Sequence, residues 1–162
     1  MSIVLLLLVG VTACNDRMPT ADQAEEVEPK KLATEPAAMQ AVVDLFDAMR
    51  AGDSSAMAQV LPYGIPIKTV YEREGKVEVY TSNSTQLLQQ VGTPHEQVYD
   101  ERISSLKVMR SGHLATAWMD YAFYLDTTVS HCGVNTITFY QNNGQWQVLS
   151  LADTREACPL DN

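Results

Sequence analysis

The chain has 162 residues, a formal net charge of −9, 46% hydrophobic residues and three cysteines. Once an N-terminal segment is set aside, this length fits one domain of ordinary size with enough residues for a substantial core. The acidic chain lacks the basic patches that displace counterions from nucleic acid, so we expect no nucleic-acid partner. Its acidic charge favours solubility and disfavours anionic partners, but it identifies no function.

The first fourteen residues have the pattern of an export signal. Residues 3–9 form an apolar run that suits a signal peptide and is too short to span a bilayer. Residues 11–14 read Val-Thr-Ala-Cys and resemble the bacterial lipobox, although no Lys or Arg precedes the apolar run. The resemblance implies cleavage before Cys14 and lipidation of Cys14. The alternative is an ordinary signal peptide with an incidental cysteine.

A tether is expected between the lipid and the domain. The segment from Asn15 to Thr34 is acidic, contains prolines and has too few large apolar residues to fold; a rival interpretation is an acidic interaction tail. The predicted division is a signal peptide over 1–13, a lipidated Cys14 with a disordered acidic tether over 14–34, and a domain over 35–162. In lipoproteins of this kind an Asp directly after the cysteine retains the protein at the inner membrane. Asn15 stands there instead, which favours a bacterial outer-membrane protein that faces the periplasm.

Three helices and a hairpin are predicted in the first half of the domain. A long helix begins at Thr34, ends at Gly52 and has one apolar face, made by Met39, Val42, Val43, Phe46 and Met49. A shorter helix follows, capped by Asp53 or Ser54 and ended by Pro62. Residues 65–80 indicate a hairpin that turns at Glu74-Gly75, and residues 82–92 indicate a third helix.

Long strands are predicted from Val98 onward. The first ends at Arg110, and the second covers residues 113–126. Alternation along the second strand places one continuous apolar set towards the helices: Ala117, Met119, Tyr121, Phe123 and Leu125. Its other face carries Trp118, Asp120 and Tyr124, and we expect this face to be wet or to pair with another subunit.

A hairpin closes the chain. Asn143-Gly144 separates two runs with high β propensity, which is a strong hairpin signal. Regular pairing across this turn places Phe139 opposite Val148, Ile137 opposite Ser150 and Cys132 opposite Arg155. Both faces of the hairpin carry apolar groups, so we expect it inside the sheet and not at a solvated edge.

Three helices ahead of a long antiparallel sheet that ends in Gly144-x-Trp146-x-Val148 resemble the nuclear transport factor 2-like superfamily. The resemblance covers residues 36–158. It implies an α+β fold in which a cone-shaped, curved antiparallel sheet wraps a long N-terminal helix, with two shorter helices and an enclosed pocket. Residues 131–133 and 153–155 with Cys158 look like a secreted bacterial subgroup of unassigned role, within the SnoaL-like and ketosteroid isomerase-like proteins. The superfamily holds both enzymes and binding domains, so the fold does not imply a function.

The two remaining cysteines, Cys132 and Cys158, are expected to form a disulfide. An exported protein folds in an oxidising compartment, where such pairs form. The regular pairing leaves Cys158 three residues beyond the partner of Cys132, so the tail must curl back to reach it. The alternative is a reactive or metal-binding thiol. The three histidines lie far apart and no Cys-x-x-Cys occurs, so we expect neither a metal nor a cofactor.

Four polar residues are candidates for the pocket: Tyr121, His131, Asp153 and Arg155. Asp153 and Arg155 share one face of a strand and would orient a polar ligand or transfer a proton. The alternatives are a local ion pair, or an Asp153 that holds the neighbouring backbone with Arg155 at the rim. His131 is a candidate general base or a structural, hydrogen-bonded residue.

Three functions remain open. The first is a lipid-anchored domain that binds a small, largely apolar molecule, with no assigned catalysis. The second is an isomerase or dehydratase with His131 or Asp153 as its catalytic residue. Ketosteroid isomerases join an Asp base to a Tyr and a protonated Asp, but alternation places Asp120 and Asp126 on the face opposite Tyr121. The third is an envelope adaptor that docks through the outer sheet face, where a homodimer is also expected to form.

Overall fold

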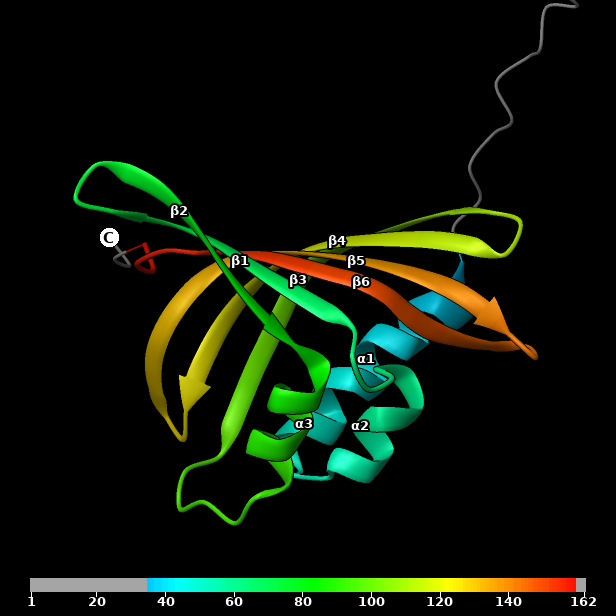
Figure 1. Cartoon of the computed structure of the whole chain (residues 1–162), viewed down its shortest axis with the longest axis horizontal. Helices are drawn as coiled ribbons and strands as arrows, with labels where there is room; N and C mark the ends of the chain where they lie inside the picture. Colours follow the sequence, from blue (N-terminus) through cyan, green and yellow to red (C-terminus); the bar gives the residue numbers. More distant parts are fainter. Residues whose placement is uncertain (1–34, 160–162) are drawn as a thin grey trace, which may run out of the picture. The chain divides into compact units, whose positions relative to one another are not determined.

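The structure is a computed structural model that describes residues 35–159. The helices are α1 (Pro36–Arg50), α2 (Ser54–Val60) and α3 (Ser84–Gly92). The strands are β1 (Pro66–Arg73), β2 (Lys76–Asn83), β3 (Tyr99–Ser111), β4 (Leu114–Leu125), β5 (Thr128–Asn142) and β6 (Gln145–Arg155). This order of elements is the predicted one (Figure 1).

The six strands form a single open sheet in the order β2-β1-β6-β5-β4-β3. Figure 1 shows the strands curving over the helices, which gather on the concave side. Neighbouring strands are antiparallel except for one pair, because β6 inserts beside β1 in parallel. The α+β curved sheet is thus confirmed, with this one parallel pair as a difference. The closing hairpin lies inside the sheet, as predicted, since β5 and β6 both have neighbours on each side.

Helix α1 packs its apolar face against the concave side of the sheet. Its buried residues recur at helical spacing: Ala38, Ala41, Val42, Leu45, Phe46, Ala48 and Met49. Glu35 occupies the N-cap position, and the predicted cap Thr34 lies outside the described residues. The helix ends at Arg50, and Gly52 follows with a φ of +67°. Arg50 Nε donates to Asp100 Oδ1 on β3 at 2.6 Å, which ties this helix end to the sheet.

Side-chain caps start the two short helices. Asp53 accepts a hydrogen bond from the backbone N–H of Ala56 at 2.8 Å and begins α2. Asn83 and Gln86 form a capping box at the start of α3. The buried Ser84 hydroxyl donates to the Pro62 carbonyl and accepts from the Ile65 N–H, at 2.6 and 2.9 Å. These bonds tie the start of α3 to the segment between α2 and β1.

The β5–β6 pairing is regular only near its turn. Phe139 lies opposite Val148, as predicted. The register then shifts by one residue, so Ile137 faces Leu151 and the predicted pairing with Ser150 is wrong. For the same reason Cys132 pairs with Glu156 and not with Arg155. A bulge of this kind bends a strand, and the strong curvature of this sheet requires such bends.

Cys132 and Cys158 are joined by a disulfide across a sequence separation of 26. Two backbone hydrogen bonds of 2.9 and 3.0 Å between Cys132 and Glu156 hold the end of β6 beside β5. The chain then turns back to Cys158, as predicted.

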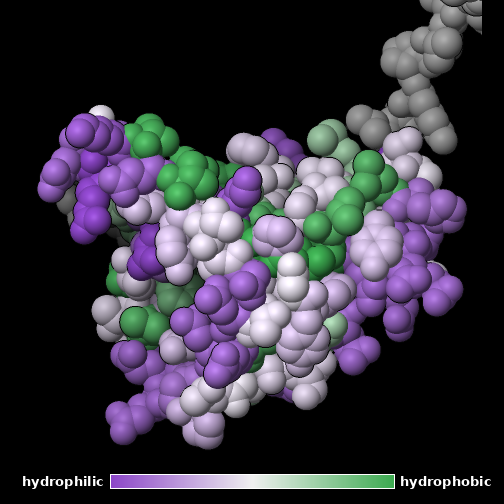
Figure 2. Space-filling model, in the orientation of Figure 1, coloured by the Kyte–Doolittle hydropathy of each residue, from purple (hydrophilic) through white to green (hydrophobic). Residues whose placement is uncertain are grey.

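Alternation along β4 divides the sheet into two faces. Ala117, Met119 and Tyr121 are buried against the helices, whereas Trp118 is 53% exposed on the opposite face. Figure 2 shows further hydrophobic side chains on the β1–β2 hairpin beside its hydrophilic tip, where Val77 and Val79 are exposed. No helix within residues 35–159 has the length and apolar character needed to cross a membrane.

Candidate functional site

A cavity of about 430 Å³ lies between the concave face of the sheet and the three helices. We call it the inner cavity. Its apolar lining comes from helices and strands alike: Leu45, Phe46, Met49, Met57, Leu61, Ile67, Leu87, Phe123, Leu125 and Leu151. Its polar lining is Thr69, Gln90, Tyr99, Glu101, Tyr121, Ser130, His131, Asn135, Asp153 and Arg155. This volume and this mixed lining are typical of a site for a small organic molecule.

The structure brings all four sequence-predicted residues, Tyr121, His131, Asp153 and Arg155, into this cavity. They come from three adjacent strands, β4, β5 and β6. Because the register of these strands is fixed by backbone pairing, the four side chains meet on the concave face although they span a long stretch of sequence.

Asp153 is held by neutral donors. It lies between Thr69 on β1 and Asn135 on β5 in the sheet register. Thr69 Oγ1 donates to Asp153 Oδ1 at 2.8 Å, and the Tyr121 hydroxyl lies 3.4 Å from Oδ2. Burial raises the pKa of this carboxyl, although both hydrogen bonds and the charge of Arg155 act in the opposite direction. Within residues 35–159 no salt bridge joins Asp153 to Arg155, so the alternative of a local ion pair is not realised.

Tyr121 fixes the end of β6 against β4. Its hydroxyl donates to the backbone carbonyl of Thr154 at 2.8 Å. Burial, and then the nearby carboxyl groups of Asp153 and Glu101, raise its pKa. Gly133 makes this contact possible, since a Cβ there would lie 1.9 Å from the Thr154 carbonyl oxygen and 2.8 Å from Tyr121 Cε1.

His131 is packed among aromatic rings. Its ring centroid lies 5.1 Å from that of Phe123 and 5.7 Å from that of Tyr121, which it meets edge-on. Burial, and then the charge of Arg155, lower its pKa to about 4. The imidazole is therefore neutral at pH 7 and a weak proton acceptor, which favours the structural role over the general base.

Glu101 is the residue that sequence reasoning missed. Asn135 Nδ2 donates to Glu101 Oε1 at 2.6 Å, and Asn135 is buried. Burial raises the pKa of Glu101 to about 7, assisted by the charge of Asp153 and opposed by the bond from Asn135. Alternation back from the buried Phe139 and Ile137 would have placed Asn135 inside. Glu101 stands in a charged stretch of the edge strand β3, where sequence gives no sign of burial.

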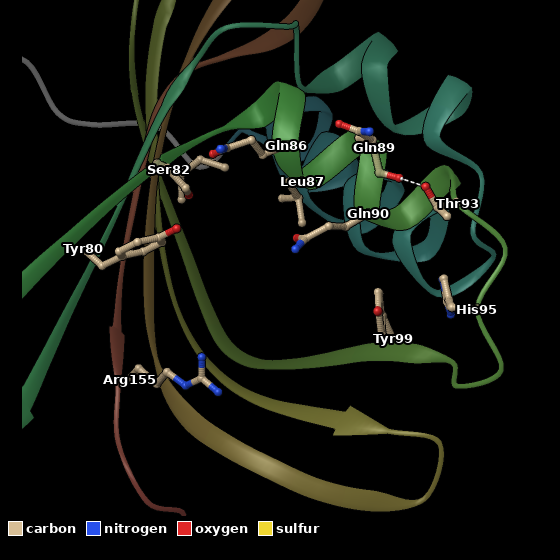
Figure 3. Close-up of a pocket in the computed structure, with 11 residues that line it drawn as sticks. Tyr80, Ser82, Gln86, Leu87, Gln89, Gln90, Thr93, His95, Tyr99 and Arg155 are labelled. Atoms are coloured by element: carbon tan, nitrogen blue, oxygen red, sulfur yellow. Dashed lines mark hydrogen bonds between the residues drawn. The ribbon is translucent and has the colours of Figure 1, made fainter.

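A second, outer cavity of about 730 Å³ adjoins the first. The two share Ile67, Leu87, Gln90, Tyr99 and Arg155 in their linings. The remaining lining of the outer cavity is polar and aromatic, with Tyr80 and Ser82 from β2 and Gln86 and Gln89 from α3 among its residues. Figure 3 shows α3 along one side of this space and the side chain of Arg155 entering it from the other. In Figure 2 the surface is hollowed beneath the β1–β2 hairpin.

The arrangement supports two kinds of chemistry. Apolar walls with a polar group of two carboxyls and a phenol can bind a small molecule and fix its orientation. A carboxyl with a pKa of about 7 can also transfer a proton near neutral pH, which is the requirement for a general acid or base. Within residues 35–159 no three His, Cys, Asp or Glu side chains are grouped so as to hold a metal ion.

Comparison with known proteins finds similar solved structures but no similar sequence. No protein-family model matches the sequence, and no curated protein matches it. A nuclear transport factor 2-like protein of unknown function from Shewanella baltica has a TM-score of 0.57 at 13% identity, and the match covers 75% of this chain and 93% of that one.

Two further matches carry functional descriptions of their own. A candidate dehydratase of the nuclear transport factor 2-like family from Streptomyces avermitilis has a TM-score of 0.55 at 13% identity, over 75% of this chain and 95% of that one. The β subunit of a candidate aromatic-ring-hydroxylating dioxygenase from Novosphingobium aromaticivorans has a TM-score of 0.59 at 9% identity, over 77% and 90%. Likeness at such low identity shows the fold alone. Residues 35–159 therefore form a domain with the nuclear transport factor 2-like fold.

Proposed function

We propose that this domain binds a small, largely apolar molecule with one polar end in the inner cavity. The observation that carries the proposal is the asymmetry of the lining: Glu101, Tyr121 and Asp153 are grouped together on the sheet, whereas the helices contribute apolar side chains apart from Gln90. An apolar body buried against those walls supplies most of the binding free energy, at roughly 25 cal/mol per Å² of apolar surface. The polar end then determines the orientation, because it must satisfy buried hydrogen-bonding groups.

The neutral fluorophore N-phenyl-1-naphthylamine tests this proposal, because it is apolar and has a single N–H donor. We expect saturable fluorescence enhancement with the protein. Gln90 lines both cavities, so Gln90→Trp should fill the shared space and weaken binding about tenfold or more. Gln59→Trp makes the same change on α2, where Gln59 is exposed and lines neither cavity, and should leave binding unchanged. Equal binding by both variants, or no saturable binding at all, would contradict the proposal.

A second function, an isomerase or dehydratase, is favoured by Glu101. Its pKa of about 7 suits proton transfer, and the Tyr121 hydroxyl lies 3.4 Å from the nearby Asp153 carboxyl. Conversion of 3-cyclohexenone to its conjugated isomer, followed by ultraviolet absorption, provides a simple assay. We expect acceleration that Glu101→Gln removes and that Glu72→Gln, an exposed change on β1, retains. A reaction no faster than in buffer would leave binding as the function of the cavity.

We further propose that the protein is anchored in the bacterial envelope through lipid on Cys14, facing the periplasm. Cys14 lies outside the described residues, and the support is the lipobox-like sequence together with a disulfide that suits an oxidising compartment. In a bacterial host fed alkyne-palmitate, the protein should carry the label and fractionate with membranes. Cys14→Ser should lose both properties, and a variant that keeps the label would contradict the anchor.

We also propose that the protein forms a homodimer through the outer face of the sheet. Trp118, Met109, Leu114 and Leu149 support it, because all four are large apolar side chains that are about half exposed. Burial of such groups is what a stable subunit interface provides. The adaptor function would instead require this face to stay open after the protein assembles.

A further inference from the structure

We propose that the ligand of the inner cavity is an amphipathic anion: an apolar body with one carboxylate, sulfonate or phosphate group that binds Arg155 at the junction of the cavities. This inference rests on the proposed small-molecule function and adds the chemical class of the ligand. It assigns Arg155 as the residue that recognises the charge, and the apolar lining of the inner cavity as the site of the body.

Arg155 lines three neighbouring cavities. It borders the inner cavity, the outer cavity and a third hollow beside the β1–β2 hairpin. In Figure 3 its guanidinium group points into the open space that faces Leu87, Gln90 and Tyr99. Arg155 therefore lies at the boundary that the outer and inner cavities share.

The guanidinium of Arg155 has no carboxylate partner among the described residues. Arg50, Arg102 and Arg110 each form a salt bridge, and no salt bridge within residues 35–159 includes Arg155. Its neighbour on the strand, Asp153, is engaged by Thr69 and Tyr121 instead. An arginine with its fork of donors directed into a cavity is suited to bind a planar or tetrahedral oxyanion through two hydrogen bonds.

The charges inside the cavity fix the orientation of such a ligand. Glu101 and Asp153 both lie in the inner cavity and would repel an anion that entered head first. The anionic group is therefore held at Arg155 while the apolar body enters, and the polar end that reaches Glu101, Tyr121 and Asp153 is an uncharged group of that body. The positive charge acts locally, which is how a chain with a net charge of −9 can still select an anion.

Uncharged donors line the same outer cavity. Ser82, Gln86 and Gln90 line the outer cavity together with Arg155. The Gln86 Oε1 accepts from the Asn83 N–H in the capping box, which leaves the amide nitrogen of Gln86 as a donor. Hydroxyl and amide donors across the cavity from Arg155 can serve the oxygen atoms that the guanidinium does not reach.

Two fluorophores that differ by one sulfonate test the inference. N-phenyl-1-naphthylamine is neutral, and 8-anilino-1-naphthalenesulfonate adds an anionic group to the same aromatic body. We expect the sulfonate to bind more tightly to the unmodified protein. Arg155→Gln should weaken sulfonate binding about tenfold and change binding of the neutral probe by less than about twofold. Retained binding of the neutral probe also shows that this variant is folded.

Arg73→Gln is the matched control. It removes the same charge from the third hollow, and Arg73 lines neither the inner nor the outer cavity. It should leave both affinities unchanged. Sulfonate binding that Arg155→Gln does not weaken, or that Arg73→Gln weakens equally, would overturn the anion assignment and leave the proposed function standing. Failure of both probes to bind the unmodified protein would instead contradict the proposed function itself.

Discussion

The carboxyl group of Glu101 lines the inner cavity, but its burial there opposes its ionisation. It lies in a cavity that can serve a ligand, and burial raises its pKa from 4.5 to about 7. The groups that face it are Asn135 on β5, Asp153 on β6 and Tyr121 on β4. Asn135 donates to the carboxyl, whereas the charge of Asp153 opposes its ionisation. When the buried carboxyl of Glu101 ionises, the free energy of unfolding falls. A residue that lowers stability in this way is a candidate for a functional role rather than a packing role.

Glu101→Gln should therefore stabilise the domain at high pH. The unfolded chain releases this proton near pH 4.5 and the folded chain near pH 7, so the free energy of unfolding falls as pH rises between these values. The variant should be more stable by about 2–3 kcal/mol at pH 8 and equal to the unmodified protein near pH 4.5. Urea unfolding at the two pH values measures the difference. Glu72→Gln on the exposed side of β1 should show no such gain, and a gain of the same size at both pH values would contradict the expectation.

His131 should titrate far below an ordinary histidine. Its folded pKa of about 4 lies below 6.5, so the stability that the neutral ring contributes is complete above pH 6.5 and is lost as pH falls through 4. The midpoint of the His131 imidazole C2 proton in NMR measures this directly, and His131→Gln assigns the signal among the three histidines. A midpoint near 6.5 would mean that the ring is solvated and does not line the cavity.

At the scale of elements, residues with special geometry and the register next to a turn were predictable, whereas the register beyond a bulge was not. Asn143-Gly144 and Glu74-Gly75 have positive φ angles at both positions, which is the geometry that tight hairpins require. The hydrogen bond from the Ala56 N–H to the Asp53 side chain, which caps α2, likewise involves only residues close in sequence. The bulge at Leu149 has no such signature, because it relieves a curvature that only the whole sheet creates.

Because strand register is hard to predict, the sequence indicated only some of the residues that line the inner cavity. Tyr121 followed from alternation along one strand, and Asp153 and Arg155 from their spacing on another. Glu101 was missed because its burial depends on an irregular β3–β4 pairing and on Asn135 two strands away. The four predicted residues came together because all lie on the three central strands, whereas β3 is an edge strand whose neighbours sequence alone did not define.

The disulfide should contribute substantially to stability through the unfolded chain. A crosslink with a sequence separation of 26 restricts the unfolded ensemble by about 3.5 kcal/mol. The double substitution Cys132→Ser with Cys158→Ser should lower the free energy of unfolding by about that amount in urea. Reduction of the unmodified protein should reproduce the loss, whereas Cys14→Ser should not. An unchanged midpoint after reduction would show that the bridge does not form.

At the scale of the whole domain, the two faces of the sheet carry different features. The concave face holds the helices and the inner cavity, which we propose as the ligand site. The convex face carries large apolar side chains without a described partner in residues 35–159. An open sheet with such a face is exposed to self-association, and the proposed dimer would cover it.

The domain should therefore sediment as a dimer that depends on the convex face. Trp118 is 53% exposed and lies on the face of β4 opposite the buried Ala117 and Met119. Trp118→Glu therefore places a charge in the proposed interface and leaves the core unchanged. We expect this variant to sediment as a monomer at micromolar concentration and to retain binding of N-phenyl-1-naphthylamine. Val77→Glu is the control, because Val77 is 73% exposed on the β1–β2 hairpin, and it should remain dimeric. If Val77→Glu dissociates the dimer and Trp118→Glu does not, the hairpin is the interface, and the convex face stays open for the adaptor function.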